Sequence, residues 1–358
     1  MEAATANAGV ADGTDRKTNP RAWWVAPLEP YAGANLRSSL VCLATSVFAY
    51  LGLWVAMYYL RADGLTAVWL VLLIPASGFL LRTYIVFHDC THGSFMRTKR
   101  ANTWVGVAVG LIVFSPFHSW RQEHAGHHAT AGDIDRRGVG DVQTLTVSEY
   151  KARTRGARLR YRLMRSPWIM FTLGPIWSLA IGPRIVPKNK RKRIRNSHRN
   201  TNLALLVLVA GAIWLVGWAA FVEIQFPMIL MAGAAGVWLF YVQHQFEGAY
   251  WKHSDDWSYL DAALQGSSYL KLGKVLAFFT GYIGLHHVHH LNPRIPNYNL
   301  QRAHDENEFL HRAPTLSLWD GFRTVRFKLI DDDTGELLTF AQARRAMAAH
   351  EQPAALAA

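Results

Sequence analysis

The chain has few cysteines and no apolar segment near its start. Only Cys42 and Cys90 occur among 358 residues, so the sequence predicts no disulfide framework. Cys42 lies in an apolar block and Cys90 inside a histidine motif, which fits a reducing, cytoplasm-facing active region. The first 35 residues or so are polar and hold no hydrophobic signal core. We therefore expect no cleaved secretory peptide.

Acidic residues are also scarce, and the formal net charge is +13. A basic chain can bind nucleic acid, but 14 tryptophans and long uncharged runs favour a membrane surface instead. Hydrophobic residues make up 51% of the chain. They gather into blocks close to the ~20 residues that cross a bilayer core. The sequence therefore predicts a membrane protein with no nucleic acid partner.

Four apolar blocks have the length of spanning helices. They cover about residues 40–60, 65–87, 203–222 and 226–244. Only residues 61–64 separate the first two blocks, and only residues 223–225 separate the last two. Because links this short force antiparallel neighbours, the chain should enter the membrane twice and return each time to the same side.

Positive charges beside the blocks set the orientation. Arg97, Lys99 and Arg100 follow the second block. A longer basic run precedes the third block: Lys188, Lys190, Arg191, Lys192, Arg193, Arg195 and Arg199. Both segments should be cytoplasmic. We therefore expect an integral protein of a bacterial cytoplasmic membrane, with its active site facing the cytoplasm.

Three shorter apolar stretches remain, at residues 104–117, 168–186 and 275–285. We interpret them as interfacial or partly inserted segments. The alternative is that one of them spans the membrane, which would invert everything after it. The basic run at residues 188–199 argues against that inversion.

These features predict an all-α integral membrane fold, with four transmembrane helices in two hairpins and a cytoplasmic helical cap. We expect a polar N-terminal tail over residues 1–35, a membrane domain over residues 36–330 and a C-terminal tail over residues 331–358.

Sixteen histidines are unusual in so apolar a chain, and eight of them form three clusters. The clusters are His88 and His92; His124, His127 and His128; and His286, His289 and His290. Their spacings of three and four residues place cluster members on one helix face. All three clusters fall on the predicted cytoplasmic side, near a membrane boundary.

Such clusters suit a metal centre. Neutral imidazole is a good iron ligand, and eight imidazoles exceed the needs of one ion but suit a pair. One histidine pair alone would usually be incidental, whereas three clusters on one membrane face favour metal binding. Asp89 and Glu123 adjoin cluster histidines and are candidate acceptors for their ring N–H groups.

His244 ends the fourth apolar block at the same membrane face. A lone histidine there is usually an interfacial anchor, but its position makes it the best candidate for a ninth ligand. His287 lies between cluster members and should point away from them. The remaining histidines have no partner at a useful spacing: His118, His198, His253, His304, His311 and His350.

The three motifs HDCTHGS, EHAGHH and GYIGLHHVHHLNPRIPNYNL resemble the histidine boxes of membrane fatty acid desaturases. The resemblance runs from about residue 40 to residue 327. It implies four spanning helices, a cytoplasmic centre of two non-haem irons and O₂-dependent removal of two hydrogens from an acyl chain. The family's iron ligands carry over to the eight cluster histidines, and its fourth-helix histidine resembles His244.

The first and third boxes look most like those of acyl-lipid delta-12 (omega-6) desaturases. Front-end desaturases typically carry glutamine where this chain has His286. The resemblance implies an acyl lipid or acyl thioester substrate and an external electron donor of the ferredoxin or cytochrome b5 type. The chain contains no HPGG haem motif, so we expect no fused cytochrome b5 domain. Residues 129–133 differ from the common plant pattern, which leaves bond position and carrier open.

Two other classes of function remain as alternatives. A membrane hydroxylase, carotenoid ketolase or alkane monooxygenase would share the boxes, because hydroxylation and desaturation both begin with hydrogen abstraction. A metal transporter or b-type cytochrome is the more distant alternative. A transporter needs polar groups at mid-membrane, and the spanning blocks are nearly free of ionisable residues.

Overall fold

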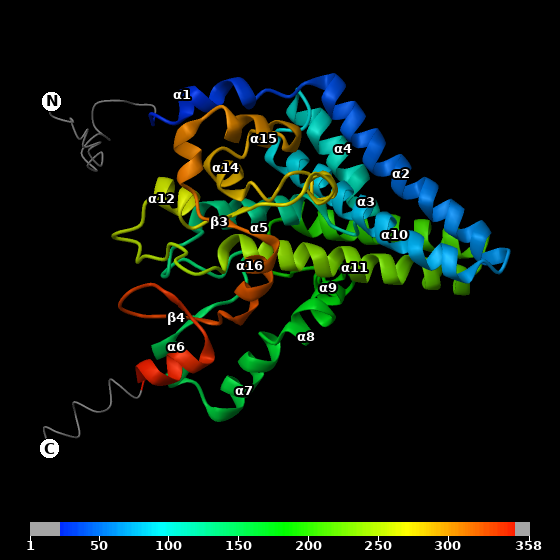
Figure 1. Cartoon of the computed structure of the whole chain (residues 1–358). Coiled ribbons are helices and arrows are strands. Elements are labelled where there is room, and N and C mark those ends of the chain that lie inside the picture. The colour runs from blue at the N-terminus through cyan, green and yellow to red at the C-terminus, as the bar shows by residue number, and fades with distance from the viewer. Residues whose placement is uncertain (1–21, 348–358) are drawn as a thin grey trace, which may run out of the picture.

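A computed structural model describes residues 22–347. Within this part of the chain, four helices are long and apolar enough to cross a membrane. They are α2 (Leu36–Ala62), α3 (Thr66–His92), α10 (Lys192–Val216) and α11 (Trp218–His244). Figure 1 shows them as long neighbouring helices, with the smaller helices of the cap gathered at one end. The predicted architecture of two hairpins and a helical cap is confirmed. The second hairpin turns at Gly217, however, and the predicted link at residues 223–225 lies inside α11.

The ends of the spanning helices follow from local sequence. Asn35 begins α2 because its side-chain oxygen accepts a hydrogen bond from the backbone N–H of Ser38 at 3.1 Å. Gly93 ends α3 in the left-handed conformation, with φ of 76°. Helix α3 is therefore longer than its apolar block, and the first histidine box forms its last turn.

The two hairpins pack together mainly through α3 and α11, which are more buried than α2 and α10. Gln225 of α11 provides a polar contact, since its side-chain oxygen accepts hydrogen bonds from Tyr50 (2.8 Å) and Trp54 (3.1 Å) of α2. Large apolar side chains such as Phe48 and Trp214 are exposed. In a bilayer these side chains would face lipid.

The three shorter apolar stretches do not form long straight helices. Helices α4 (Lys99–Ile112) and α5 (Phe117–Thr130) meet at an angle of 103° and together form a broken span or a re-entrant loop. Residues 168–186 lie mostly in four short helical pieces. These pieces are α8 (Pro167–Phe171), α9 (Leu173–Pro175), the π-helix η3 (Ile176–Ile181) and the 3₁₀ helix η4 (Gly182–Arg184). The third stretch overlaps α13 (Lys274–Phe279).

The cap consists of short helices and a few paired strands. Its helices are α1 (Val25–Leu28), η2 (Glu29–Tyr31), α6 (Val147–Ala152), α7 (Arg155–Met164), α12 (Tyr259–Leu264), α14 (His286–Leu291), α15 (Asn297–Asp305), η5 (Glu308–Arg312), α16 (Leu318–Arg323) and η6 (Thr324–Arg326). Strand β4 (Leu329–Ile330) pairs in parallel with β1 (Leu145–Thr146) and antiparallel with β5 (Leu337–Leu338). Strand β2 (Tyr269–Leu270) pairs in parallel with β3 (Thr315–Leu316). These strands tie distant segments of the cap together.

Lys328 is a buried cation of the cap. Its ammonium lies 5.4 Å from the centre of the Tyr241 ring and has no hydrogen-bond partner among the described residues. Burial, and to a smaller extent the charge of Arg165, lowers the pKa of Lys328 to about 7. An unfolded chain holds this proton up to about pH 10.4. Stability should therefore rise as the pH rises from about 7 to about 10.

The Lys328→Met variant should be more stable than the wild type by about 1–3 kcal/mol near neutral pH, because it removes an unpaired buried charge. It should also lose part of the rise in stability above pH 7. Thermal unfolding in detergent across this pH range measures both effects. Lys252→Met, at an exposed position, is the matched control. Equal pH profiles for the two variants would contradict this interpretation.

Candidate metal centre

The last turn of α3, helix α5, the last turn of α11 and helix α14 bring nine histidines together. His92 is half-buried, and the other eight are buried. They divide into a five-histidine group and a four-histidine group. The five-histidine group contains His88, His92, His124, His128 and His289, and the four-histidine group contains His127, His244, His286 and His290. In each group, every ring offers one nitrogen atom, and these nitrogen atoms all lie within 4.8 Å of one another.

Helix geometry explains this division. His124 and His128 are four residues apart and share one group, whereas His127 belongs to the other. The third box divides in the same way, since His286 and His290 share a group and His289 lies in the other. Adjacent helical residues point about 100° apart, so His127 and His128 cannot face one ion. Each of these two helices therefore contributes to both groups.

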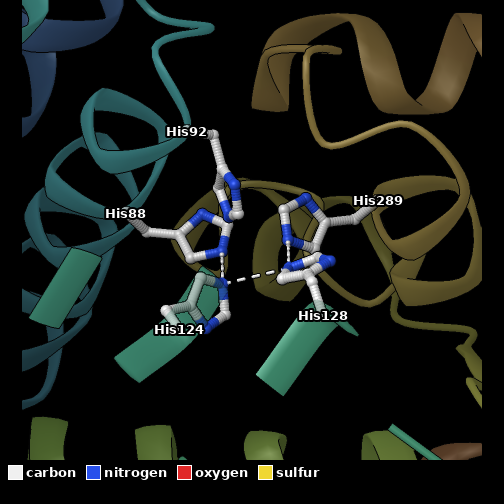
Figure 2. A group of neighbouring side chains, drawn as sticks. All are labelled: His88, His92, His124, His128 and His289. Atoms are coloured by element: carbon white, nitrogen blue, oxygen red, sulfur yellow. Dashed lines mark hydrogen bonds between the residues drawn. The ribbon is translucent and has the colours of Figure 1, made fainter. Parts of the chain in front are cut away.

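The ring nitrogens have the spacing of ligands around an ion. In the five-histidine group, the Nε2 of His124 is 3.0 Å from that of His88 and 3.2 Å from that of His128. The Nε2 atoms of His128 and His289 are 3.0 Å apart. Figure 2 shows the five rings facing one another. A metal–nitrogen bond of ~2.1 Å places ligands at right angles ~3.0 Å apart.

The four-histidine group has the same spacing. The Nε2 of His127 is 3.1 Å from that of His244 and 3.2 Å from that of His290. The Nε2 atoms of His244 and His286 are 3.0 Å apart.

In the five-histidine group, the Nε2 of His92 is buried and has no hydrogen-bond partner among the described residues. A metal ion would supply that partner, so both groups fit one ion each.

The rings of α14 are neutral at physiological pH. Burial, followed by the neighbouring histidines, holds the pKa values of His286, His289 and His290 well below their usual range. Neutral imidazole keeps the free electron pair that a metal ligand needs.

Three histidines are oriented by acceptors at their other nitrogen. Asp89 accepts from the Nδ1 of His88 at 3.0 Å, and the Gly266 carbonyl accepts from the Nδ1 of His244 at 2.9 Å. Asp141 accepts from the Nδ1 of His127. Because each Nδ1 carries the hydrogen, each Nε2 is free to face the group.

Of the two carboxylates named from the sequence, the structure places only Asp89 against a ring nitrogen of a grouped histidine. Glu123 accepts a hydrogen bond from the Ser119 hydroxyl at 3.2 Å instead, because its side chain turns back along α5. Asp141 was not identified from the sequence. The available signal was an acidic residue that directly follows Gly140 in the segment Gly138-Val139-Gly140-Asp141.

Close packing brings the Asp141 loop onto α5. Gly140 has φ of +71°, and a Cβ there would lie 2.9 Å from the Glu123 carbonyl oxygen. A Cβ at Gly126 would lie 2.6 Å from the Val139 side chain. Position 140 therefore requires glycine for the loop to approach, whereas a larger residue at position 126 would displace the Val139 side chain.

The other histidines lie outside both groups. His287 contacts His304, with 3.1 Å between their nitrogens, and His253 contacts Asp135. His198 contacts the Pro183 carbonyl and Ser119. His118 belongs to neither group, and His311 contacts the carbonyl of His304. His350 lies outside the described residues.

Asn297 holds Asp89 in place. Its backbone N–H and its side-chain amide both donate to Asp89 Oδ2, at 2.7 and 2.8 Å. Asn297→Leu should lower the free energy of unfolding by about 1–3 kcal/mol, because a buried carboxylate loses a donor. Thermal unfolding measures this loss. Asn299→Leu removes one hydrogen bond to the Tyr31 carbonyl and is the matched control. If Asn297→Leu lowered the free energy of unfolding no more than Asn299→Leu does, this role of Asn297 would be contradicted.

A largely apolar cavity of about 380 Å³ opens onto both groups. It is lined by His88 and His124 of the five-histidine group and by His286 of the four-histidine group. Trp120 also lines it and stacks on His124, with 4.3 Å between ring centres. From the histidines the cavity runs between α3 and α11.

Comparisons with known proteins identify the family of this chain. The fatty acid desaturase family model matches residues 63–316. A fatty acid desaturase of Bacillus subtilis is 43% identical over 310 residues, which cover 87% of this chain and 88% of the relative. An sn-1 oleoyl-lipid 12-desaturase of Synechocystis is 29% identical over 299 residues, which cover 77% of this chain and 76% of the relative. An sn-1 acyl-lipid omega-3 desaturase (ferredoxin) of Synechocystis is 28% identical over 62% of each chain. The chain belongs to the fatty acid desaturase family.

Proposed function

We propose that this chain introduces a cis double bond into a lipid-linked acyl chain, with O₂ as co-substrate. The observation that carries the proposal is the apolar cavity that opens onto two histidine groups. Such a cavity suits a long apolar substrate, since specific groups at one end face its otherwise apolar wall. The reaction needs an oxidising centre beside a held methylene chain, and this arrangement supplies both.

The nine grouped histidines would hold two iron ions, one in each group. When bound, the iron pair supplies the O₂-dependent oxidation. The residues of the chain contribute geometry: Asp89, Asp141 and the Gly266 carbonyl hold three rings in the ligand tautomer. The cavity walls exclude water and fix which carbons lie beside the centre.

Several observations support the finer details of the proposal. The delta-12 position and the lipid carrier come from the box resemblance and from relatives named sn-1 oleoyl-lipid 12-desaturases, at 28–29% identity. The name of the relative at 43% identity gives no bond position. One relative is named with ferredoxin, and we propose a donor of the ferredoxin or cytochrome b5 type. The basic residues at 188–199 support a cytoplasmic site in a bacterial cytoplasmic membrane.

Expression in a host rich in monounsaturated fatty acids tests the proposal, with His127→Ala as the control. Gas chromatography–mass spectrometry with derivatisation locates each double bond. We expect a new diene with its second bond at the delta-12 position, absent from the control. A bond elsewhere would reject the delta-12 assignment, and a hydroxylated acid would favour the hydroxylase alternative.

A further inference from the structure

The two ends of the cavity differ in polarity. Near the histidines its lining includes Tyr84, Glu123, Asp141 and Gln243. The residues that α3 and α11 contribute farther from the histidines are apolar, and we call this part the apolar arm. Ser178 and Leu179 of η3 also line the cavity, and the Ser178 hydroxyl donates to the Pro175 carbonyl. The apolar arm is lined by Leu80, Leu81, Ile229, Ala232, Gly233, Gly236 and Val237.

The apolar arm reaches far from the histidines. Ile229 precedes His244 by 15 residues along α11, and at 1.5 Å per residue this is about 22 Å. Gly236 precedes His244 by 8 residues, or about 12 Å. Leu81 precedes His88 by 7 residues of α3, or about 10 Å, so it lies at a similar depth. About 10 Å of the arm therefore lies beyond Gly236.

Packing does not explain the glycine at position 236. A Cβ there would meet only the Leu81 Cδ1, at an ordinary contact distance of 3.7 Å. At Gly233, by contrast, a Cβ would lie 2.7 Å from the Pro175 Cβ, so that glycine is needed for packing. Gly236 also lies within α11, where glycine is a poor helix former. Because Gly236 has no side chain, the apolar arm stays open opposite Leu81.

We propose that the apolar arm receives the methyl end of the acyl chain and that Gly236, with Leu81, sets the length accepted beyond the metal centre. The inference rests on the proposed function, because it assumes an acyl substrate. A polar ester or headgroup would lose its hydrogen bonds in this arm, so the methyl end must enter it. Each methylene that finds no room in the arm should lower the relative rate about fourfold.

The test supplies cells with fatty acids of graded length and compares the products of the wild type and Gly236→Leu. Leucine adds four carbon atoms opposite Leu81, so the ratio of long to short products should fall at least about tenfold. Adding Leu81→Ala to the same chain should restore the ratio, because it returns the lost space. Gly52→Leu is the matched control, since Gly52 is exposed on α2 and a Cβ there meets nothing within 4 Å.

An unchanged ratio, or an equal fall at every length, would overturn the inference. If Gly236→Leu does not accumulate, Gly236→Ala should give a smaller shift in the same direction, and no shift would overturn it. A hydroxylated product from the wild type would overturn the proposed function instead. The length ratio of that product would still support or contradict the role of the arm.

Discussion

Replacing His244 by alanine should abolish product formation and lower the iron content from two ions to about one per chain. The four-histidine group would keep only three rings, and the five-histidine group would be untouched. The loss of activity should exceed the 10–100-fold cost of removing an outer partner of a metal ligand. Elemental analysis of the purified protein and product analysis measure the two effects.

His287→Ala is the matched control for this variant. His287 is buried beside His286, yet it contacts His304 and belongs to neither group. The control should keep two iron ions per chain and form product. If His244→Ala also kept both properties, His244 would be an interfacial anchor, the alternative reading of a lone histidine at this membrane face.

Replacing Asp141 by asparagine should weaken iron binding about 10–100-fold, because His127 loses its charged acceptor. Asparagine has nearly the same shape. The second oxygen of Asp141 has no hydrogen-bond partner among the described residues, so the fold should lose little stability. Iron retention during titration with a chelator measures the affinity, and thermal unfolding of the iron-free protein measures the stability.

Asp135→Asn provides the control for Asp141. Asp135 also accepts from a histidine Nδ1, at 2.9 Å, but its partner His253 is exposed and lies outside both groups. This variant should bind iron like the wild type. Equal affinities for Asp141→Asn and the wild type would contradict the role of Asp141 as a positioning residue.

Much of the fold follows from local features of the sequence. The short link at residues 61–64 allows only an antiparallel hairpin, and the structure has its first turn there. The second turn lies at Gly217, whereas the predicted link at residues 223–225 lies inside α11, because its polar side chains Glu223 and Gln225 contact α2 instead of ending the helix. The bend between α4 and α5 was not predicted; at the break Phe114 has a positive φ of 59° and Pro116 directly precedes α5. A Cβ at Gly106 would lie 2.2 Å from the Phe117 ring, so α4 and α5 pack closely there only because residue 106 is glycine.

The sequence also located the nine histidines, and the structure brings all nine together. Spacing alone suggested that each cluster aims at one point. Helix geometry separates the adjacent histidines of the second and third boxes, but which of them joins His88 or His244 depends on where α5 and α14 lie relative to α3 and α11. Asp141 could not be paired with His127, because it lies 14 positions later in the chain, in a loop after α5 whose course is set by packing against α5.

Anomalous X-ray diffraction at the iron absorption edge tests the central claim most directly. Crystals of the iron-loaded protein should show two iron peaks per chain, one within each histidine group. A single peak, peaks outside the two groups, or zinc in place of iron would contradict the proposed diiron centre.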